Sequence, residues 1–248
     1  MSDWVYGIHA VTALVRREPR AIEVLCVAGA RQSKRLAELE RLARDQGIAV
    51  EHLSREELDA RADGRHQGVA ARMARGHTLA AVDEAGLMAL VQRTERPLLL
   101  ILDEITDPHN LGACLRTADA AGVTAVVVPR DGSADLGPVV RKVACGAADT
   151  VPFVRVTNLA RTLRALRDAG VWLVGTSDGA PGTVYDQDLT GATAIVMGAE
   201  GRGMRRLTAE HCDFLVKLPM LGTVSSLNVS VATGICLYEA LRQRSGGQ

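Results

Sequence analysis

Residues 97–119 read Pro97-Leu-Leu-Leu-Ile-Leu-Asp-Glu-Ile-Thr-Asp-Pro-His-Asn-Leu-Gly-Ala-Cys-Leu-Arg-Thr-Ala-Asp119. The aliphatic run at 98–102 is uninterrupted, which is typical of a parallel strand buried on both faces. A polar loop follows, and apolar residues then return at helical spacing from Leu111 onward. A buried strand joined to a helix in this way predicts a crossover connection and hence an α/β sheet.

The rest of residues 97–248 continues this alternation. Further strands are predicted at 123–128, 151–156, 171–175, 194–198 and 214–218, and helices at 111–121, 138–147, 159–169, 204–210 and 226–242. Such an order builds a parallel sheet that helices cover on both sides. Ligands bind sheets of this kind at the carboxyl ends of the strands.

Residues 1–75 predict a separate, small N-terminal α/β domain. Their pattern favours helices at 7–15 and 34–46 and strands at 22–27, 48–53 and 68–73. Ser54 and Glu57 have the spacing of a capping box, which predicts one more helix. The pattern loosens over 76–96, so we expect a linker there and a second domain at 97–248.

The charge balance limits how this protein can bind nucleic acid. Lys plus Arg and Asp plus Glu are equal at 29 each, so bulk positive charge is excluded as the source of binding. RNA contacts would need local patches. The candidate patches are Arg16, Arg17 and Arg20; Arg31, Lys34 and Arg35; Arg72 and Arg75; Arg141 and Lys142; and Arg202, Arg205 and Arg206.

The composition also limits the class of protein. Of the 248 residues, 47% are hydrophobic and only 3% aromatic, which predicts an aliphatic core. The five cysteines form no C-x-x-C pair, and the six histidines lack metal-ligand spacing, so we expect neither disulfides nor a metal. No apolar run approaches the roughly 18 residues of a membrane span, and no export signal is visible. We therefore expect a cytoplasmic protein.

Three loops follow strands at the edge where a ligand is expected. The first carries Asn110, in the position of a helix N-cap, and Arg116. The second, at 194–204, has its glycines in the order G-x-x-G-x-G, which differs from the dinucleotide fingerprint G-x-G-x-x-G. The third, at 218–228, ends in residues that favour a helix start, among them Asn228. Capping and tight turns would explain each loop taken singly.

In combination, the three loops resemble the SpoU-type branch of the SPOUT RNA methyltransferases. The matching motifs are N-x-G-x-x-x-R (Asn110, Gly112, Arg116), the G-A-E-G-x-G turn at 198–203 and the I/L-P-M…S-L-N segment at 218–228. Tyr6-Gly-Ile-His-Ala-Val and His66-Gln-Gly-Val are similar to the small RNA-binding domain, of a ribosomal-protein type, that precedes the catalytic domain in some members. The segments at 106–110, 142–147 and 224–228 most resemble members that methylate a guanosine ribose in the peptidyl-transferase region of 23S rRNA.

The resemblance implies a C-terminal trefoil knot and S-adenosylmethionine as cosubstrate, without a metal. The implied cofactor-binding residues are Thr176, Ser177, Gly198, Gly201, Leu218, Met220 and Leu227, and the implied catalytic residues are Asn110, Arg116, Glu200, Ser226 and Asn228. Because the cosubstrate carries a sulfonium cation, backbone groups and apolar walls suit it better than lysines do. The family also pairs its knots, and the helix after Val229 lacks a polar face, so we expect a homodimer.

The implied reaction is methyl transfer to a ribose 2′-oxygen. The family mechanism assigns deprotonation to the residue that matches Arg116, but a guanidinium with a pKa above about 12 is a poor base. Clamping a phosphate and stabilising the developing alkoxide is an easier role to defend. Asn110, Ser226 and Asn228 would orient the ribose. Glu200 would attract the cation, contact the ribose, or be an ordinary loop carboxylate.

Three alternative functions stay open on sequence grounds. The first is a tRNA 2′-O-ribose methyltransferase of the same family. The second is a catalytically silent RNA-binding factor for ribosome assembly, which the presence of Arg116 and Glu200 disfavours. The third is a nicotinamide-dependent oxidoreductase, which the order of the glycines disfavours.

Overall fold

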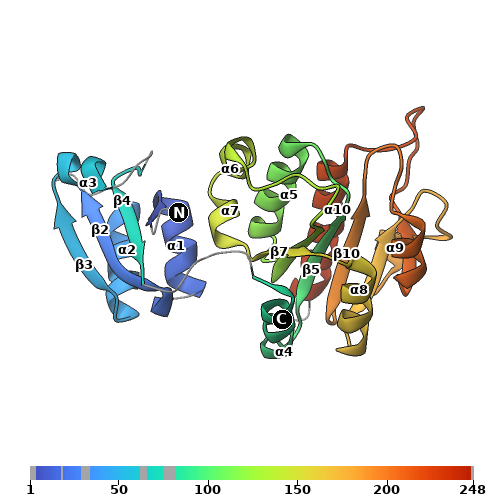
Figure 1. Ribbon diagram of the computed structural model, residues 1–248, viewed down its shortest axis with the longest axis horizontal. Coiled ribbons are helices and arrows are strands. Elements are labelled where there is room, and N and C mark those ends of the chain that lie inside the picture. The colour runs from blue at the N-terminus through green and yellow to red at the C-terminus, as the bar shows by residue number, and fades with distance from the viewer. Residues whose placement is uncertain (1–3, 18, 29–33, 62–65, 75–81, 247–248) are drawn as a thin grey trace. The chain divides into compact units, whose positions relative to one another are not determined.

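A computed structural model describes residues 4–17, 19–28, 34–61, 66–74 and 82–246 (Figure 1). The chain divides into two compact units, Met1–Ala80 and Ala81–Gln248. In the described parts of the chain, no helix is long and apolar enough to cross a membrane.

The first unit is a four-stranded sheet with helices on both faces. Its elements are β1 (Trp4–Tyr6), α1 (Ile8–Arg17), a 3-10 turn (Pro19–Ala21), β2 (Ile22–Ala28), α2 (Lys34–Asp45), β3 (Ala49–Leu53), α3 (Arg55–Arg61) and β4 (Val69–Met73). The strand order is β1-β4-β2-β3. Alternate residues of β2 face α1 and α2 on one side and Leu58 of α3 on the other. The predicted capping box is confirmed, because the Ser54 Oγ accepts from the Glu57 amide at 3.1 Å and Glu57 accepts from the Ser54 amide at 2.7 Å.

The second unit is built on a seven-stranded parallel sheet. Its elements are α4 (Glu84–Arg93), β5 (Leu98–Asp103), α5 (Pro108–Ala120), β6 (Ala125–Pro129), α6 (Pro138–Ala144), α7 (Ala147–Thr150), β7 (Phe153–Val156), α8 (Leu159–Asp168), β8 (Trp172–Thr176), β9 (Gly182–Thr183), a 3-10 turn (Val184–Asp186), β10 (Thr193–Gly198), α9 (Arg206–His211), β11 (Phe214–Lys217) and α10 (Val229–Ser245). The strand order is β7-β6-β5-β10-β8-β11-β9. All strand pairs in this sheet are parallel, as the sequence predicts.

The core lies in two layers, one on each side of this sheet. Leu98, Leu100 and Leu102 of β5 pack with α5 and α10, whereas Leu99 and Ile101 pack with α4 and α8.

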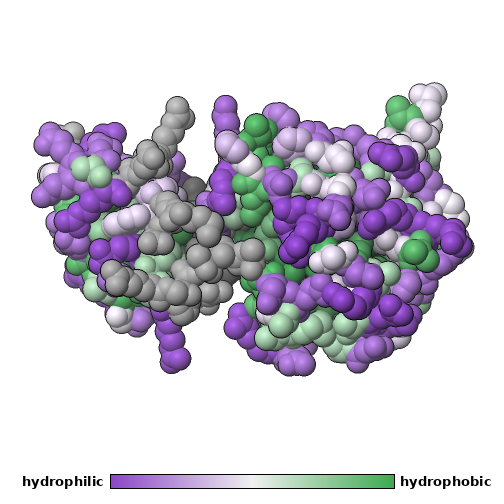
Figure 2. Space-filling model, viewed as in Figure 1, coloured by the Kyte–Doolittle hydropathy of each residue, from purple (hydrophilic) through white to green (hydrophobic). Residues whose placement is uncertain are grey.

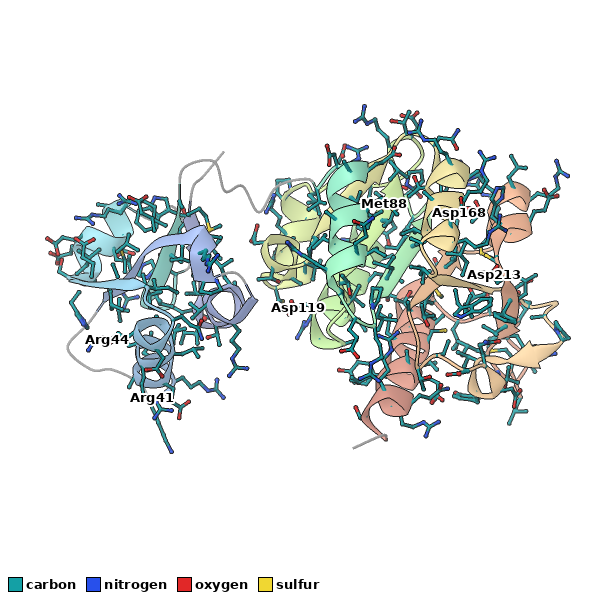
Figure 3. All side chains as sticks on the ribbon, turned by 90° about the horizontal axis from the view of Figure 1, so that it is seen from below. Arg41, Arg44, Met88, Asp119, Asp168 and Asp213 are labelled. Carbon is teal, nitrogen blue, oxygen red and sulfur yellow. The ribbon has the colours of Figure 1, made fainter. Side chains whose placement is uncertain are left out.

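Figure 3, where Met88 of α4 and Asp168 of α8 are labelled, shows α4 and α8 side by side. An ion pair between Arg161 and Glu84 joins the two helices. On the face shown in Figure 2, hydrophilic residues predominate on this unit and hydrophobic ones form small separate patches.

Two predicted boundaries differ from the structure. The span 76–96, expected as a linker, contains helix α4, whose Leu87 and Leu90 are buried against the sheet of the second unit. The helix expected at 138–147 is interrupted, because Cys145 and Gly146 have φ of 53° and 97° and so separate α6 from α7. A left-handed backbone at two successive residues ends an α-helix.

Within the described part of the chain, the side chain of Arg244, near the end of α10, donates hydrogen bonds to backbone carbonyls alone. Its Nε donates to Leu189 O at 2.9 Å and its Nη1 donates to Arg96 O at 2.8 Å. Its Nη2 donates to the carbonyls of Pro97 and Gly191. A single side chain thus ties the last described helix to the start of β5 and to the loop before β10.

Candidate active site

A cavity of about 380 Å³ opens at the carboxyl ends of β8, β10 and β11, the edge at which a ligand is predicted. Its walls are residues 176–179, 197–204, Ala209, Lys217, Leu218, Met220, Ser225, Ser226, Leu227, Val229 and Ala232. All seven residues assigned to the cosubstrate by sequence lie in this wall, and so do Glu200 and Ser226. Asp178, Arg202 and Lys217 were not expected there.

The glycine-rich turn that forms one wall is held unusually close to its own strand. Ala199 and Gly203 exchange backbone hydrogen bonds of 3.1 and 2.8 Å, which folds residues 199–203 back on themselves. A Cβ on Gly198 would lie 2.1 Å from Gly203 C and from Met204 N. Only glycine leaves room for this approach, and the positive φ of Gly201 and Gly203 (75° and 68°) fits the same residue type.

Asn228 joins three segments beside the cavity. Its Nδ2 donates to Asn110 Oδ1 at 2.9 Å and to Glu200 Oε1 at 2.7 Å. Its Oδ1 accepts from the amide and the hydroxyl of Ser230, at 3.0 and 2.6 Å, and thereby caps α10. The Val229 amide also donates to Glu200 Oε1, at 3.3 Å. The carboxylate of Glu200 is thus held at the N-terminus of a long helix, where negative charge is favoured.

The expectation that Asn110 caps α5 is wrong. Asp107 is the N-cap and accepts from the His109 amide at 3.0 Å, while Pro108 occupies the first helical turn. Pro favours that position because it has no N–H to satisfy. The side chain of Asn110 is therefore released from capping and binds Asn228 instead.

The structure brings together Asn110, Glu200 and Asn228, with Ser226 in the adjoining wall. Arg116 is not in the cavity wall. Its side chain lies exposed on α5 and has no hydrogen bond or ion pair with any described residue. Its guanidinium is accordingly available to an external anion.

The thiols near the sheet do not suit nucleophilic chemistry. Burial raises the pKa of Cys114 to about 11 and that of Cys212 to about 12. Both therefore stay protonated near neutral pH, and a thiol is a much weaker nucleophile than a thiolate. Among the residues that the structure describes, no group of three or more His, Cys, Asp or Glu side chains could hold a metal ion.

Several arginines of the predicted RNA patches are already paired with acids. Arg72 binds Glu23 and Arg206 binds Glu210, both at 2.9 Å, and Arg141 binds Asp149. Arg205 is bound to Asp103. Other members, namely Arg16, Arg20, Lys34, Arg35, Lys142 and Arg202, have no ion pair with described residues. Arg31, Arg75 and the side chain of Arg17 lie outside the described residues.

The parallel sheet, the cavity at its carboxyl edge and the folded-back turn define an α/β protein with a ligand-sized cavity at the ends of β8, β10 and β11. Residues 97–238 match the SpoU rRNA Methylase family, and residues 4–78 match the RNA 2'-O ribose methyltransferase substrate binding family. The chain belongs to the SpoU rRNA methylase family.

Curated relatives and solved structures agree with this assignment. The chain is 57% identical to the 23S rRNA (guanosine-2'-O-)-methyltransferase RlmB of Pseudomonas putida, over 97% of this chain and 96% of that protein. It is 54% identical to RlmB of Escherichia coli, over 99% of this chain and 100% of that protein. The structure of the SpoU methyltransferase AviRb from Streptomyces viridochromogenes with AdoMet is 29% identical. It covers 98% of this chain and 91% of its own, with a TM-score of 0.66.

Proposed function

We propose that this protein transfers the methyl group of S-adenosylmethionine to the ribose 2′-oxygen of a guanosine in 23S rRNA. Relatives that carry this activity in their names are 54–57% identical over nearly the whole chain. The observation that carries the proposal is the composition of the cavity wall. Residues of the turn at 198–203 and of the segment at 218–228 line it, and these are the two motifs that the family resemblance assigns to the cosubstrate.

The cavity has the chemistry that this cosubstrate needs. Met197, Leu218, Met220 and Leu227 supply apolar wall, and the glycine-rich turn exposes backbone to a planar group. Glu200 places a carboxylate in the wall, which favours a cationic sulfonium. When bound, S-adenosylmethionine supplies a methyl group already activated by a positive sulfur.

The chain's own residues orient the accepting ribose. Asn228 fixes the oxygen of Asn110 and one oxygen of Glu200. The amide N–H₂ of Asn110 and the second oxygen of Glu200 are left to meet hydroxyl groups of the substrate. Arg116, unpaired among the described residues, clamps a neighbouring phosphate, and its fixed charge stabilises the developing alkoxide.

Residues 4–78 would bring the RNA to this site, in keeping with the substrate-binding family that they match. The trefoil knot stays a prediction of the family resemblance. Because ribosomal RNA is the substrate proposed, we also propose that the protein acts in the cytoplasm.

We further propose a homodimer that pairs through α10. Thr233 and Leu237 of this helix are buried in the core, yet Val231 and Tyr238 on another side are 52% and 51% exposed. Small or apolar residues cover much of the circumference of α10, and exposed apolar side chains on such a helix need a second surface to cover them. Light scattering should give a dimeric mass for the wild type and a monomeric mass for Tyr238→Glu. A monomeric wild type would contradict the homodimer.

The central test is transfer of labelled methyl from S-adenosylmethionine to total RNA from cells that lack this protein. Wild type is compared with Arg116→Ala and with Arg164→Ala, a control on α8, which packs on the α4 side of the sheet. We expect label in one 2′-O-methylguanosine of 23S rRNA, lost only in Arg116→Ala. Label in tRNA would favour the tRNA-modifying alternative. No label in any RNA would contradict the proposal.

A further inference from the structure

The carboxylate of Asp103, at the end of β5, is fully buried and fully bonded. Its Oδ2 accepts from the Arg205 backbone amide at 2.9 Å, and its Oδ1 accepts from Arg205 Nε at 2.8 Å. Arg205 Nη2 lies 2.6 Å from the same Oδ1. Burying a carboxylate is costly unless it is paired and hydrogen-bonded. One arginine meets that need with two hydrogen bonds and an ion pair, and its side chain is itself 43% exposed.

This ion pair closes the base of the cosubstrate turn. Gly198 enters the turn from β10, opposite Asp103 in the strand register, and Arg205 follows the turn after one intervening residue, Met204. The two ends of the turn are therefore held to the same residue, one by the sheet and one by the ion pair. Glu104 adds a second carboxylate 3.4 Å from Arg205 Nη1. Neither Asp103 nor Arg205 lies in the cavity wall.

The same pair completes a ring of contacts around the site. From Asp103 the chain runs through a short loop into α5, where Asn110 binds Asn228. Asn228 binds Glu200 on the turn, and the turn returns through Arg205 to Asp103. Asn110 and Glu200 sit on segments far apart in sequence, and this ring sets their separation.

We propose that Asp103 and Arg205 are positioning residues for methyl transfer. They hold the turn so that Glu200 stays within reach of Asn228 and Asn110, and neither of them lines the cavity. The inference rests on the proposed function. A displacement of about 1 Å at a reacting group costs on the order of a hundredfold in rate, so loss of the pair should be visible in catalysis as well as in stability.

The test is a double-mutant cycle in the full-length protein, with kcat and the KM for S-adenosylmethionine measured for Asp103→Asn, Asn228→Ala and the double variant. We expect Asp103→Asn to lower kcat by about tenfold to a hundredfold. In the Asn228→Ala background, Asp103→Asn should lower kcat by less than about twofold, because the contacts of Asn228 with Asn110 and Glu200 are already lost. A double variant whose loss equals or exceeds the product of the single losses would overturn the proposal.

Glu239→Gln is the matched control, because Glu239 is also buried and is bound by Arg242. It should lower the melting temperature and leave kcat and KM unchanged. If Asp103→Asn does not fold, Arg205→Lys replaces it in the cycle, since it keeps a cation beside Asp103.

Binding of S-adenosylhomocysteine to each variant, measured by calorimetry, needs no RNA. Weaker binding in the Asp103 variant therefore supports the positioning role even if the RNA assignment fails, and unchanged binding together with unchanged kcat overturns it.

Discussion

Replacing Gly198 by alanine should disable the cavity through a single added carbon. The new Cβ would lie 2.1 Å from two backbone atoms, whereas ordinary contact begins at 3.4 Å, so the two must separate by 3.4 − 2.1 = 1.3 Å. Strand β10 cannot yield, because β5 and β8 bind it on both sides. The turn must therefore move, and Glu200, which lies on the turn and is bound to Asn228, moves with it.

Overpacking of this kind typically costs about 1–3 kcal/mol, and a backbone obstacle places Gly198→Ala at the upper end. If about 3 kcal/mol falls on the ligand-binding state, the Kd for S-adenosylhomocysteine rises about a hundredfold. Isothermal calorimetry would measure the Kd, and thermal melting followed by circular dichroism would measure stability.

Gly191→Ala is the matched control, because its Cβ would meet nothing within 4 Å and its φ is not positive. It should change neither quantity. A Gly198→Ala protein that binds S-adenosylhomocysteine as tightly as the wild type would refute the reasoning from close approach.

Three further substitutions test other parts of the structure. Asn228→Ala removes the cap of α10 and should lose about 1 kcal/mol of stability together with most of the methyl transfer. Asn158→Ala, which removes the cap of α8, should lose similar stability in thermal melts and keep its activity. Gly112→Ala places a Cβ 2.7 Å from a valine of α6 and should destabilise the protein by about 1–3 kcal/mol. The Cβ of Gly234→Ala would lie 3.7 Å from its nearest neighbour, so this variant should keep the wild-type stability. Equal melting temperatures for the two variants would contradict this. The arginine bound to Glu239 lowers the pKa of this carboxyl from 4.5 to about 2. The ion pair therefore stabilises the folded protein above pH 4.5, and this stabilisation is lost as the pH falls toward 2. In a plot of melting temperature against pH, Glu239→Gln should flatten that range.

Most strands of the second unit could be predicted because they are continuous aliphatic runs, a local signal. Helix α4 was missed because its mixed sequence becomes helical only with Leu87 and Leu90 buried on the sheet. The break in the helix expected at 138–147 depends on the left-handed backbone of Cys145. The spacing of apolar residues along the sequence does not reveal that conformation.

The site shows the same division between local and distant information. Glu200 and Asn228 could be proposed from motifs, and the residues assigned to the cosubstrate do share one cavity. The true cap of α5 is Asp107, and the proline after it was the available signal. The bond between Asn110 and Asn228 and the pairing of Asp103 with Arg205 join residues about a hundred positions apart, and spacing along the chain cannot reveal such partners.

The carbonyl contacts of Arg244 have a consequence for biosynthesis. The residues that accept its hydrogen bonds, near 96 and 190, leave the ribosome long before Arg244 does. Domains tend to fold as units while the chain is still being made. A nascent chain that has not grown past residue 244 has neither this anchor nor the complete α10, so the face of the sheet that α5 and α10 share stays only partly covered until that residue has been made.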